Sequence, residues 1–72
     1  MNLYRLNADR IAERYRMTRG KYPSSRDMQI AAGIPAFLYE RMADGEPVTL
    51  GTVQSIAPAV KAEPEEIADM LD

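Results

Sequence analysis

The stretch SSRDMQIAAGIPAFLYERMADG, residues 24–45, decides the fold, because it predicts two short helices joined by a tight turn. Ser24 is a good N-cap and Asp27 follows three residues later, which is the spacing of a capping box. Gly33 can take the left-handed conformation that ends a helix, and Pro35 suits the first turn of the next one. We therefore expect two helices that cross at an angle instead of continuing as one. They span residues 25–32 and 36–43.

This order and spacing resembles the lambda-repressor-like helix-turn-helix family of phage repressors and Cro proteins. The matching residues are Ser24 as the cap, Met28 as the apolar fourth position, Gly33 as the turn glycine, and Ile34, Tyr39, Met42 and Gly45 after it. The resemblance covers roughly residues 7–71. It implies an all-α fold, a compact bundle of about five short helices that forms a single helix-turn-helix domain over residues 1–72. The implied helices lie near 7–17, 25–32, 36–43, 50–60 and 64–71.

Two residues depart from the pattern of that family. Gln29 occupies a position where the family packs a small alanine between the two helices. Its amide must turn outward or find a hydrogen bond, since burial without a partner costs about 1–3 kcal/mol. Pro58 falls inside the expected fourth helix and removes one backbone hydrogen bond, at a cost of about 3 kcal/mol if unrelieved. We therefore expect that helix to start late or to bend.

The composition argues against catalysis and against a bound metal. The chain of 72 residues has no cysteine and no histidine, so it lacks disulfides, thiolate ligands, the usual zinc ligand and the usual general base. Carboxylates such as Glu65 and Asp69 share a helix face, but no companion nucleophile or pocket is expected beside them. We therefore expect no enzyme activity, no metal and no cofactor.

The chain also lacks the apolar segments that membranes require. Its longest apolar run, residues 30–39, is about half of the ~20 residues that span a bilayer, and it contains glycine and proline. The opening residues, MNLYRLNADR, have no signal-peptide core. We expect no membrane partner and a cytoplasmic location.

Charge is distributed unevenly along the chain. Residues 1–26 carry seven basic and two acidic side chains, a net +5, whereas residues 27–72 carry two basic and nine acidic ones, a net −7. The total of −2 taken alone argues against a polyanionic partner. The asymmetry, however, predicts a basic face that meets phosphate and an acidic face that turns away. A solvated basic helix with no partner is the alternative.

The resemblance places the second helix of the pair in the major groove of double-stranded DNA. By the pattern of the family, the base contacts fall on Ala36, Phe37, Glu40 and Arg41, with Pro35 beside them. Arg41 can bind O6 and N7 of guanine, and Ala36 and Phe37 can pack on thymine methyl groups. Glu40 can accept a hydrogen bond from cytosine N4 or repel phosphate. For Phe37, a slight rotation of the helix into the core is the alternative.

Polar and basic residues around the helix pair are predicted to hold the DNA backbone. In the resemblance, the loop with Arg19 and Lys21 lies near the backbone, although exposed loop charges without a partner are equally common. Hydroxyl and free N–H groups at the start of the first helix favour a phosphate, with plain capping as the alternative for Ser24. Surface threonine without a partner is the alternative for Thr49 and Thr52. The predicted backbone contacts are Arg19, Lys21, Ser24, Ser25, Arg26, Thr49 and Thr52.

Two functions follow from these features. The first is a sequence-specific DNA-binding transcriptional regulator, similar to a phage repressor or Cro, that occupies an operator. A homodimer would read two half-sites about one DNA turn apart, with Met70 and Leu71 either at the dimer interface or in the core. The second is a protein-binding module, an antirepressor or a modulator of a host regulator, that presents Phe37 and Leu38 to another protein. The acidic total and the apolar second helix support the second function.

Overall fold

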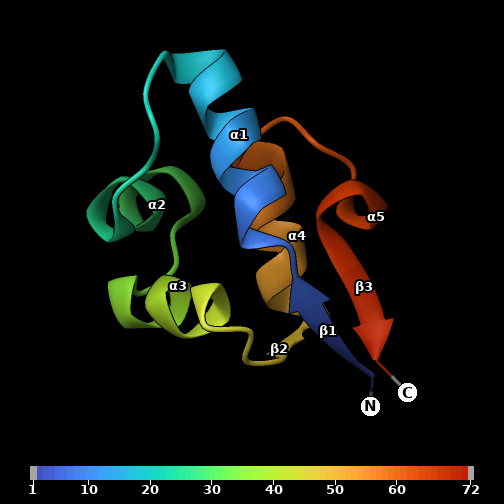
Figure 1. Cartoon of the computed structure of the whole chain (residues 1–72). Helices are drawn as coiled ribbons and strands as arrows, with labels where there is room; N and C mark the ends of the chain where they lie inside the picture. Colours follow the sequence, from blue (N-terminus) through green and yellow to red (C-terminus); the bar gives the residue numbers. More distant parts are fainter. Residues whose placement is uncertain (1, 72) are drawn as a thin grey trace.

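Helices α2 (Ser25–Ala32) and α3 (Ala36–Ala43) occupy one side of the molecule in the computed structural model, which describes residues 2–71 (Figure 1). The other elements in chain order are β1, Leu3–Leu6; α1, Ala8–Arg19; β2, Val48–Thr49; α4, Leu50–Ala59; α5, Pro64–Ile67; and β3, Ala68–Leu71. β1 and β3 lie side by side, with Leu3 opposite Leu71. The first and last described residues are therefore close together, on the side of the molecule away from α2.

The α2–turn–α3 unit forms as the local sequence predicts. The Ser24 hydroxyl accepts the backbone N–H of Asp27 at 3.1 Å, and the Asp27 carboxylate accepts the N–H of Ser24 at 3.0 Å, so the capping box is complete. Gly33 adopts the left-handed conformation, with φ +70°, and its N–H donates to the carbonyl of Gln29 at 3.0 Å. A side chain at that φ would be strained, which is why glycine ends α2. The expected bounds of both helices are confirmed.

The expectation of an all-α fold is only partly right, because within residues 2–71 three antiparallel strands accompany five helices. The strand order is β2-β1-β3, with Tyr4 opposite both Val48 and Met70. In β1, Leu6 is buried while Leu3 and Arg5 are exposed, as expected for a strand with one face on the core. The sheet provides hydrogen-bond partners for the backbone N–H and C=O groups of these extended segments.

The last helix is much shorter than expected, four residues instead of eight. Ala68 is extended, with φ −142° and ψ 144°, and the chain continues as β3 along the free edge of β1. The carbonyl of Ile67 accepts the N–H of Asn7 at 2.7 Å, and this bond holds the junction of α5 and β3 beside the start of α1. Met70 and Leu71 therefore belong to an edge strand and not to the apolar side of a helix.

Pro58 lies in the last turn of α4, so the helix neither starts late nor is interrupted in its middle. Only one i→i−4 hydrogen bond is lost there, and the helix ends one residue later.

α1 is longer than expected at its C-terminal end. It continues through Arg19, two residues beyond the expected bound. Gly20 then ends it in the left-handed conformation, with φ +78°.

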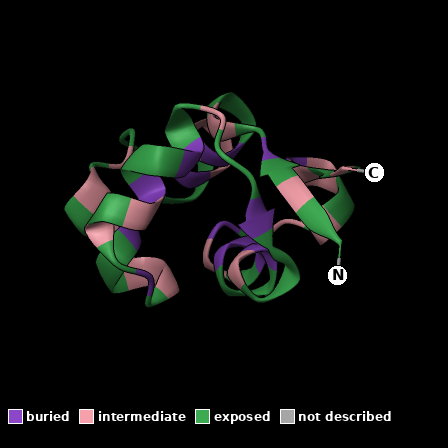
Figure 2. Ribbon diagram, turned by 90° about the horizontal axis from the view of Figure 1, so that it is seen from below, coloured by how far each residue is buried: buried purple, intermediate pink, exposed green. Residues whose placement is uncertain are grey.

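Buried residues are concentrated where the helices and β1 face one another, whereas exposed residues cover the outward faces (Figure 2). Met28, Ile34 and Met42 of the α2–turn–α3 unit are buried in the core, and Ala32 packs against it. Gln29 is exposed, so its amide does turn outward. The buried residues form one core: Leu6, Ile11, Tyr15, Met28, Ile34, Tyr39, Met42, Val48, Val53, Ile56, Ala57, Val60 and Ile67.

The end of α4 contains a lysine in a conformation that normally requires glycine. Lys61 has φ +55°, while the N–H of Ala62 donates to the Ala57 carbonyl at 3.0 Å and the N–H of Lys61 to the Pro58 carbonyl at 3.2 Å. These two bonds form a Schellman motif, in which the left-handed position favours glycine. An ordinary L-residue is strained there by about 1–2 kcal/mol.

Lys61→Gly is therefore expected to raise the free energy of unfolding by about 0.5–1 kcal/mol, after the larger unfolded-state entropy of glycine is subtracted. Urea unfolding followed by circular dichroism measures this change. Lys61→Ala is the control, because it removes the charge and keeps the strain. An equal gain in both variants would show that the charge, and not the backbone conformation, sets the effect.

Candidate functional site

α3 presents a mixed polar and apolar face to solvent. Tyr39 and Met42 are buried and attach the helix to the core, whereas Phe37 is 56% exposed and Glu40 and Arg41 are also exposed. Burial raises the pKa of the Tyr39 hydroxyl above its ordinary value. The alternative that Phe37 rotates into the core is wrong, because the burial of Tyr39 and Met42 leaves the Phe37 side of the helix facing solvent. Ala36 is half-buried at the start of this outward face.

Phe37 and Arg41 lie one turn apart and contact each other on this face. The guanidinium carbon of Arg41 is 5.3 Å from the centre of the Phe37 ring, a cation–π distance. The Arg41 Nε atom is 3.8 Å from a carboxylate oxygen of Glu46, which is a loose ion pair between exposed side chains. Such a pair contributes little to stability. The α3 surface is thus centred on one exposed aromatic ring and one exposed guanidinium group.

The N-terminus of α2 is occupied by its own capping box. The Ser24 hydroxyl is used by the Asp27 N–H, so the plain capping explanation for Ser24 is confirmed. Hydrogen bonding from Ser24, and then the charge of Lys21 at 3.4 Å, lower the pKa of Asp27 below its ordinary value. Ser25 is half-buried and Arg26 is exposed beside this carboxylate. A phosphate at this position must therefore be bound mainly by Arg26 and by backbone N–H groups.

The lowered pKa of Asp27 predicts how stability depends on pH. A carboxyl with a lower pKa in the folded state stabilises the fold above its unfolded pKa, near 3.8, and loses this contribution as the pH falls further. Asp27→Asn is therefore expected to lower the urea midpoint at pH 7, and the difference from wild type should shrink below about pH 3. Asp44→Asn, with the same charge change after α3, should show no such drop. A constant difference at every pH would contradict the assignment.

The basic side chains of α1 contact the protein body. Arg14 forms an ion pair with the Glu66 carboxylate, and Arg10 donates to the Glu66 carbonyl at 3.1 Å, so both reach α5. Arg16 pairs with Glu13 on its own helix, and this hydrogen bond lowers the pKa of Glu13. The basic face predicted from residues 1–26 is therefore not one open surface, because Arg10 and Arg14 turn toward α5 instead of α3.

Arg19 and Lys21 have different surroundings from those expected for free loop charges. Arg19 ends α1, stacks over the Tyr15 ring at 4.5 Å, and donates to the carbonyl of Ala59 at 2.8 Å. It thus caps the C-terminal end of α4, where a cation is favourable. Lys21 follows in the loop, 64% exposed, and pairs with Asp27. Of these two residues, Lys21 remains the more accessible for phosphate.

The remaining predicted residues lie at the start of α4, in β3 and on α3. Thr49 and Thr52 flank the start of α4, with their hydroxyl oxygens 3.4 Å apart, and they are exposed and half-buried respectively. Met70 is 55% exposed and Leu71 is half-buried in β3, at an edge of the sheet that has no further strand within residues 2–71. Leu38 is partly buried against the core, so Phe37 is much more accessible than its neighbour.

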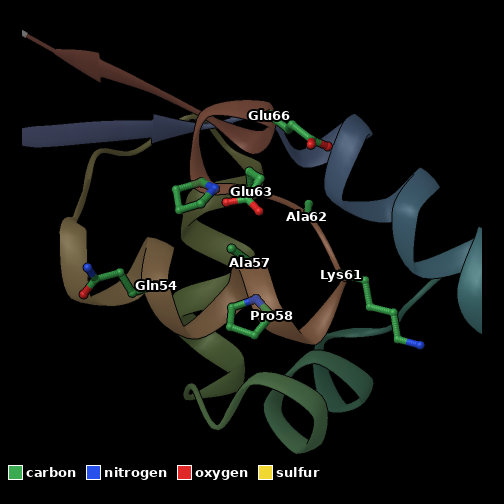
Figure 3. Close-up of a pocket in the computed structure, with 8 residues that line it drawn as sticks. Gln54, Ala57, Pro58, Lys61, Ala62, Glu63 and Glu66 are labelled. Carbon is green, nitrogen blue, oxygen red and sulfur yellow. The ribbon is translucent and has the colours of Figure 1, made fainter.

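A surface hollow of about 470 Å³ lies at the junction of α4 and α5 (Figure 3). Ala57, Pro58 and Glu63 face it, whereas the Lys61 amine points away. None of the predicted contact residues lines it. Within residues 2–71, no histidine, cysteine, aspartate and glutamate side chains gather as a metal site would require, and no helix there has the length and apolar content to cross a membrane.

Two features of the site were missed by the sequence interpretation. The stacking of Arg41 on Phe37 has a sequence signal, because residues four apart share a helix face. The contact of Arg41 with Glu46 has none, since it depends on how the chain turns after α3. Comparisons of the chain with protein-family models, with curated proteins and with solved structures found no match.

Proposed function

We propose that the chain is a sequence-specific DNA-binding regulator that inserts α3 into the major groove and acts by occupying its site. The observation that carries the proposal is the α2–turn–α3 unit, in which Tyr39 and Met42 attach α3 to the core while Phe37, Glu40 and Arg41 face outward. A helix held in this way can enter the groove without unfolding any other element. This assignment rests on the resemblance to repressor and Cro proteins together with that geometry.

The small number of exposed cations beside α2 limits how much contacts to the DNA backbone can contribute to affinity. Lys21 and Arg26 are the exposed cations beside α2, and Lys21 is shared with Asp27. Arg26 forms no ion pair within residues 2–71. If both contact phosphate, the logarithm of affinity should fall with the logarithm of salt concentration with a slope of about −2 per bound copy. Base contacts must therefore supply a large share of the affinity.

Selection from a random-sequence duplex library tests the proposal without knowledge of the natural target. The expected result is an enriched consensus that binds the full chain in fluorescence anisotropy, with the modest salt dependence given above. Failure to enrich any sequence, with no binding at low salt, would contradict the proposal. Non-specific retention of all duplexes with a steep salt slope would contradict its sequence specificity.

A homodimer is part of this proposal. β3 is an edge strand with the exposed Met70, and an unprotected edge strand can pair with the same strand of a second copy. Two copies would then read two half-sites about one DNA turn apart. Sedimentation equilibrium is expected to show a dimer that Met70→Lys weakens, because a charge would enter the interface. If the chain stays a monomer at all concentrations although the consensus contains two half-sites, the proposal that β3 forms the dimer interface is contradicted.

A protein-binding module is the second candidate, and the 56% exposure of Phe37 favours it. An antirepressor or a modulator of a host regulator would use this ring as its anchor, since Leu38 is largely turned toward the core. Its complex would be insensitive to salt, abolished by Phe37→Ala and unaffected by Arg41→Ala. Loss of binding in both variants, with salt dependence, supports DNA instead.

A further inference from the structure

The contact between Phe37 and Arg41 leaves the hydrogen-bonding edge of the guanidinium accessible. The Arg41 side chain is 66% exposed, and its guanidinium carbon lies 5.3 Å from the Phe37 ring centre. Stacking uses the face of a guanidinium, while its N–H donors lie along the edge. The contact of Arg41 with the Glu46 carboxylate is made at Nε, at 3.8 Å. Within residues 2–71 the Nη donors form no hydrogen bond, so two of them can reach an acceptor pair.

The distance between the two groups limits which base pairs they can touch together. Neighbouring bases of one strand are about 3.4 Å apart along the duplex axis, so two steps span about 6.8 Å. The guanidinium carbon and the ring centre are 5.3 Å apart, which is less than two steps and fits one step combined with a sideways offset in the groove. Phe37 and Arg41 therefore suit adjacent bases.

The chemistry of the two groups identifies those bases. Guanine offers O6 and N7 as an acceptor pair for a guanidinium, and thymine carries a C5-methyl group that suits an apolar contact. In right-handed DNA, the methyl group of a pyrimidine on the 5′ side of guanine lies beside the guanine O6–N7 edge. An arginine bound to that guanine then has the methyl group close to its guanidinium, and the Phe37 ring, 5.3 Å from the guanidinium carbon, lies near enough to contact the methyl group from its side.

We infer that the α3 surface recognises a thymine followed by a guanine on one strand, with Arg41 on the guanine and Phe37 on the thymine methyl group. This inference rests on the proposed function and adds the bases to it. The methyl group, and not the rest of the thymine, is the recognised feature. A 5-methylcytosine before guanine presents the same group, so cytosine methylation should create a binding site from a cytosine–guanine step.

Four duplexes that differ from the selected consensus only at this step test the inference. The step is thymine–guanine, uracil–guanine, 5-methylcytosine–guanine or cytosine–guanine. Loss of the methyl group is expected to weaken binding about three- to tenfold in each pair, thymine against uracil and 5-methylcytosine against cytosine. Replacing the guanine with 7-deazaguanine should weaken binding at least about fivefold, because one acceptor is lost.

Variants identify the side chain that senses the methyl group. Phe37→Ala should reduce both methyl ratios to less than about twofold, whereas Met17→Ala, an exposed apolar residue on α1, should keep them. Because each ratio compares two duplexes with the same variant, a loss of folded protein does not alter it. A consensus without this step, or equal binding to all four duplexes, would overturn the inference and leave the proposed function intact. Failure of every duplex to bind would instead reject the proposed function.

Discussion

Arg41→Ala is expected to weaken binding to the selected duplex by about 5- to 150-fold, the range for loss of one bidentate contact to guanine. The side chain is 66% exposed and its pair with Glu46 is loose, so the fold should not change. Specificity should relax at one base pair while the other positions of the consensus keep theirs. Anisotropy titrations against the consensus and its single-base variants measure both effects.

Lys61→Ala is the matched control for Arg41→Ala, because it also replaces one positive side chain with alanine but lies after α4 and not on α3. Its affinity should stay within about twofold of wild type. An equal loss in both variants would show that Arg41 contributes only net charge. Loss in Arg41→Ala spread over all positions of the consensus would contradict a base contact.

Ile56→Ala is expected to have the largest effect on stability. Ile56 is fully buried on α4, and truncation of such a residue costs about 2–5 kcal/mol. A domain of 72 residues has only about 4–11 kcal/mol of stability in total, so the variant should lose a large part of it. Urea unfolding followed by circular dichroism measures the loss. Ile30→Ala, at a site that is 73% exposed, should change stability by less than about 0.5 kcal/mol.

A small effect at Ile56, comparable to that at Ile30, would contradict the packing of α4 against the rest of the core. The two variants remove the same atoms, so their difference reports burial alone. If Ile56→Ala still folds at low temperature, its DNA affinity there should be close to that of wild type. This follows because Ile56 is buried on α4 and does not contact the outward face of α3.

The α2–turn–α3 unit could be predicted from sequence because its signals are local. Ser24 and Asp27 cap each other across three residues, and Gly33 needs only its own backbone conformation to end the helix. The sheet could not be predicted in this way. β2 has two residues and β1 has four, and their pairing depends on segments more than 40 residues apart. A run such as residues 68–71 carries no local sign that it will leave the helix.

In the candidate site, too, local features could be predicted from the sequence and long-range contacts could not. The exposure of Glu40 and Arg41 follows from helical spacing once Tyr39 and Met42 are assigned to the core. The position of Arg19 does not follow, because its acceptor is the Ala59 carbonyl, 40 residues further along the chain. Charge asymmetry in the sequence likewise could not reveal that the arginines of α1 would be used by α5 and by their own helix.

The insertion of α3 into DNA is tested most directly by the change in amide chemical shifts of the labelled full chain when the selected duplex is added. If α3 enters the major groove, the largest changes should fall on residues 24–26 and 36–41, at the start of α2 and along α3. Changes concentrated in α5 and in the hollow it forms with α4, with α3 unaffected, would contradict the claim that α3 is the element inserted into DNA.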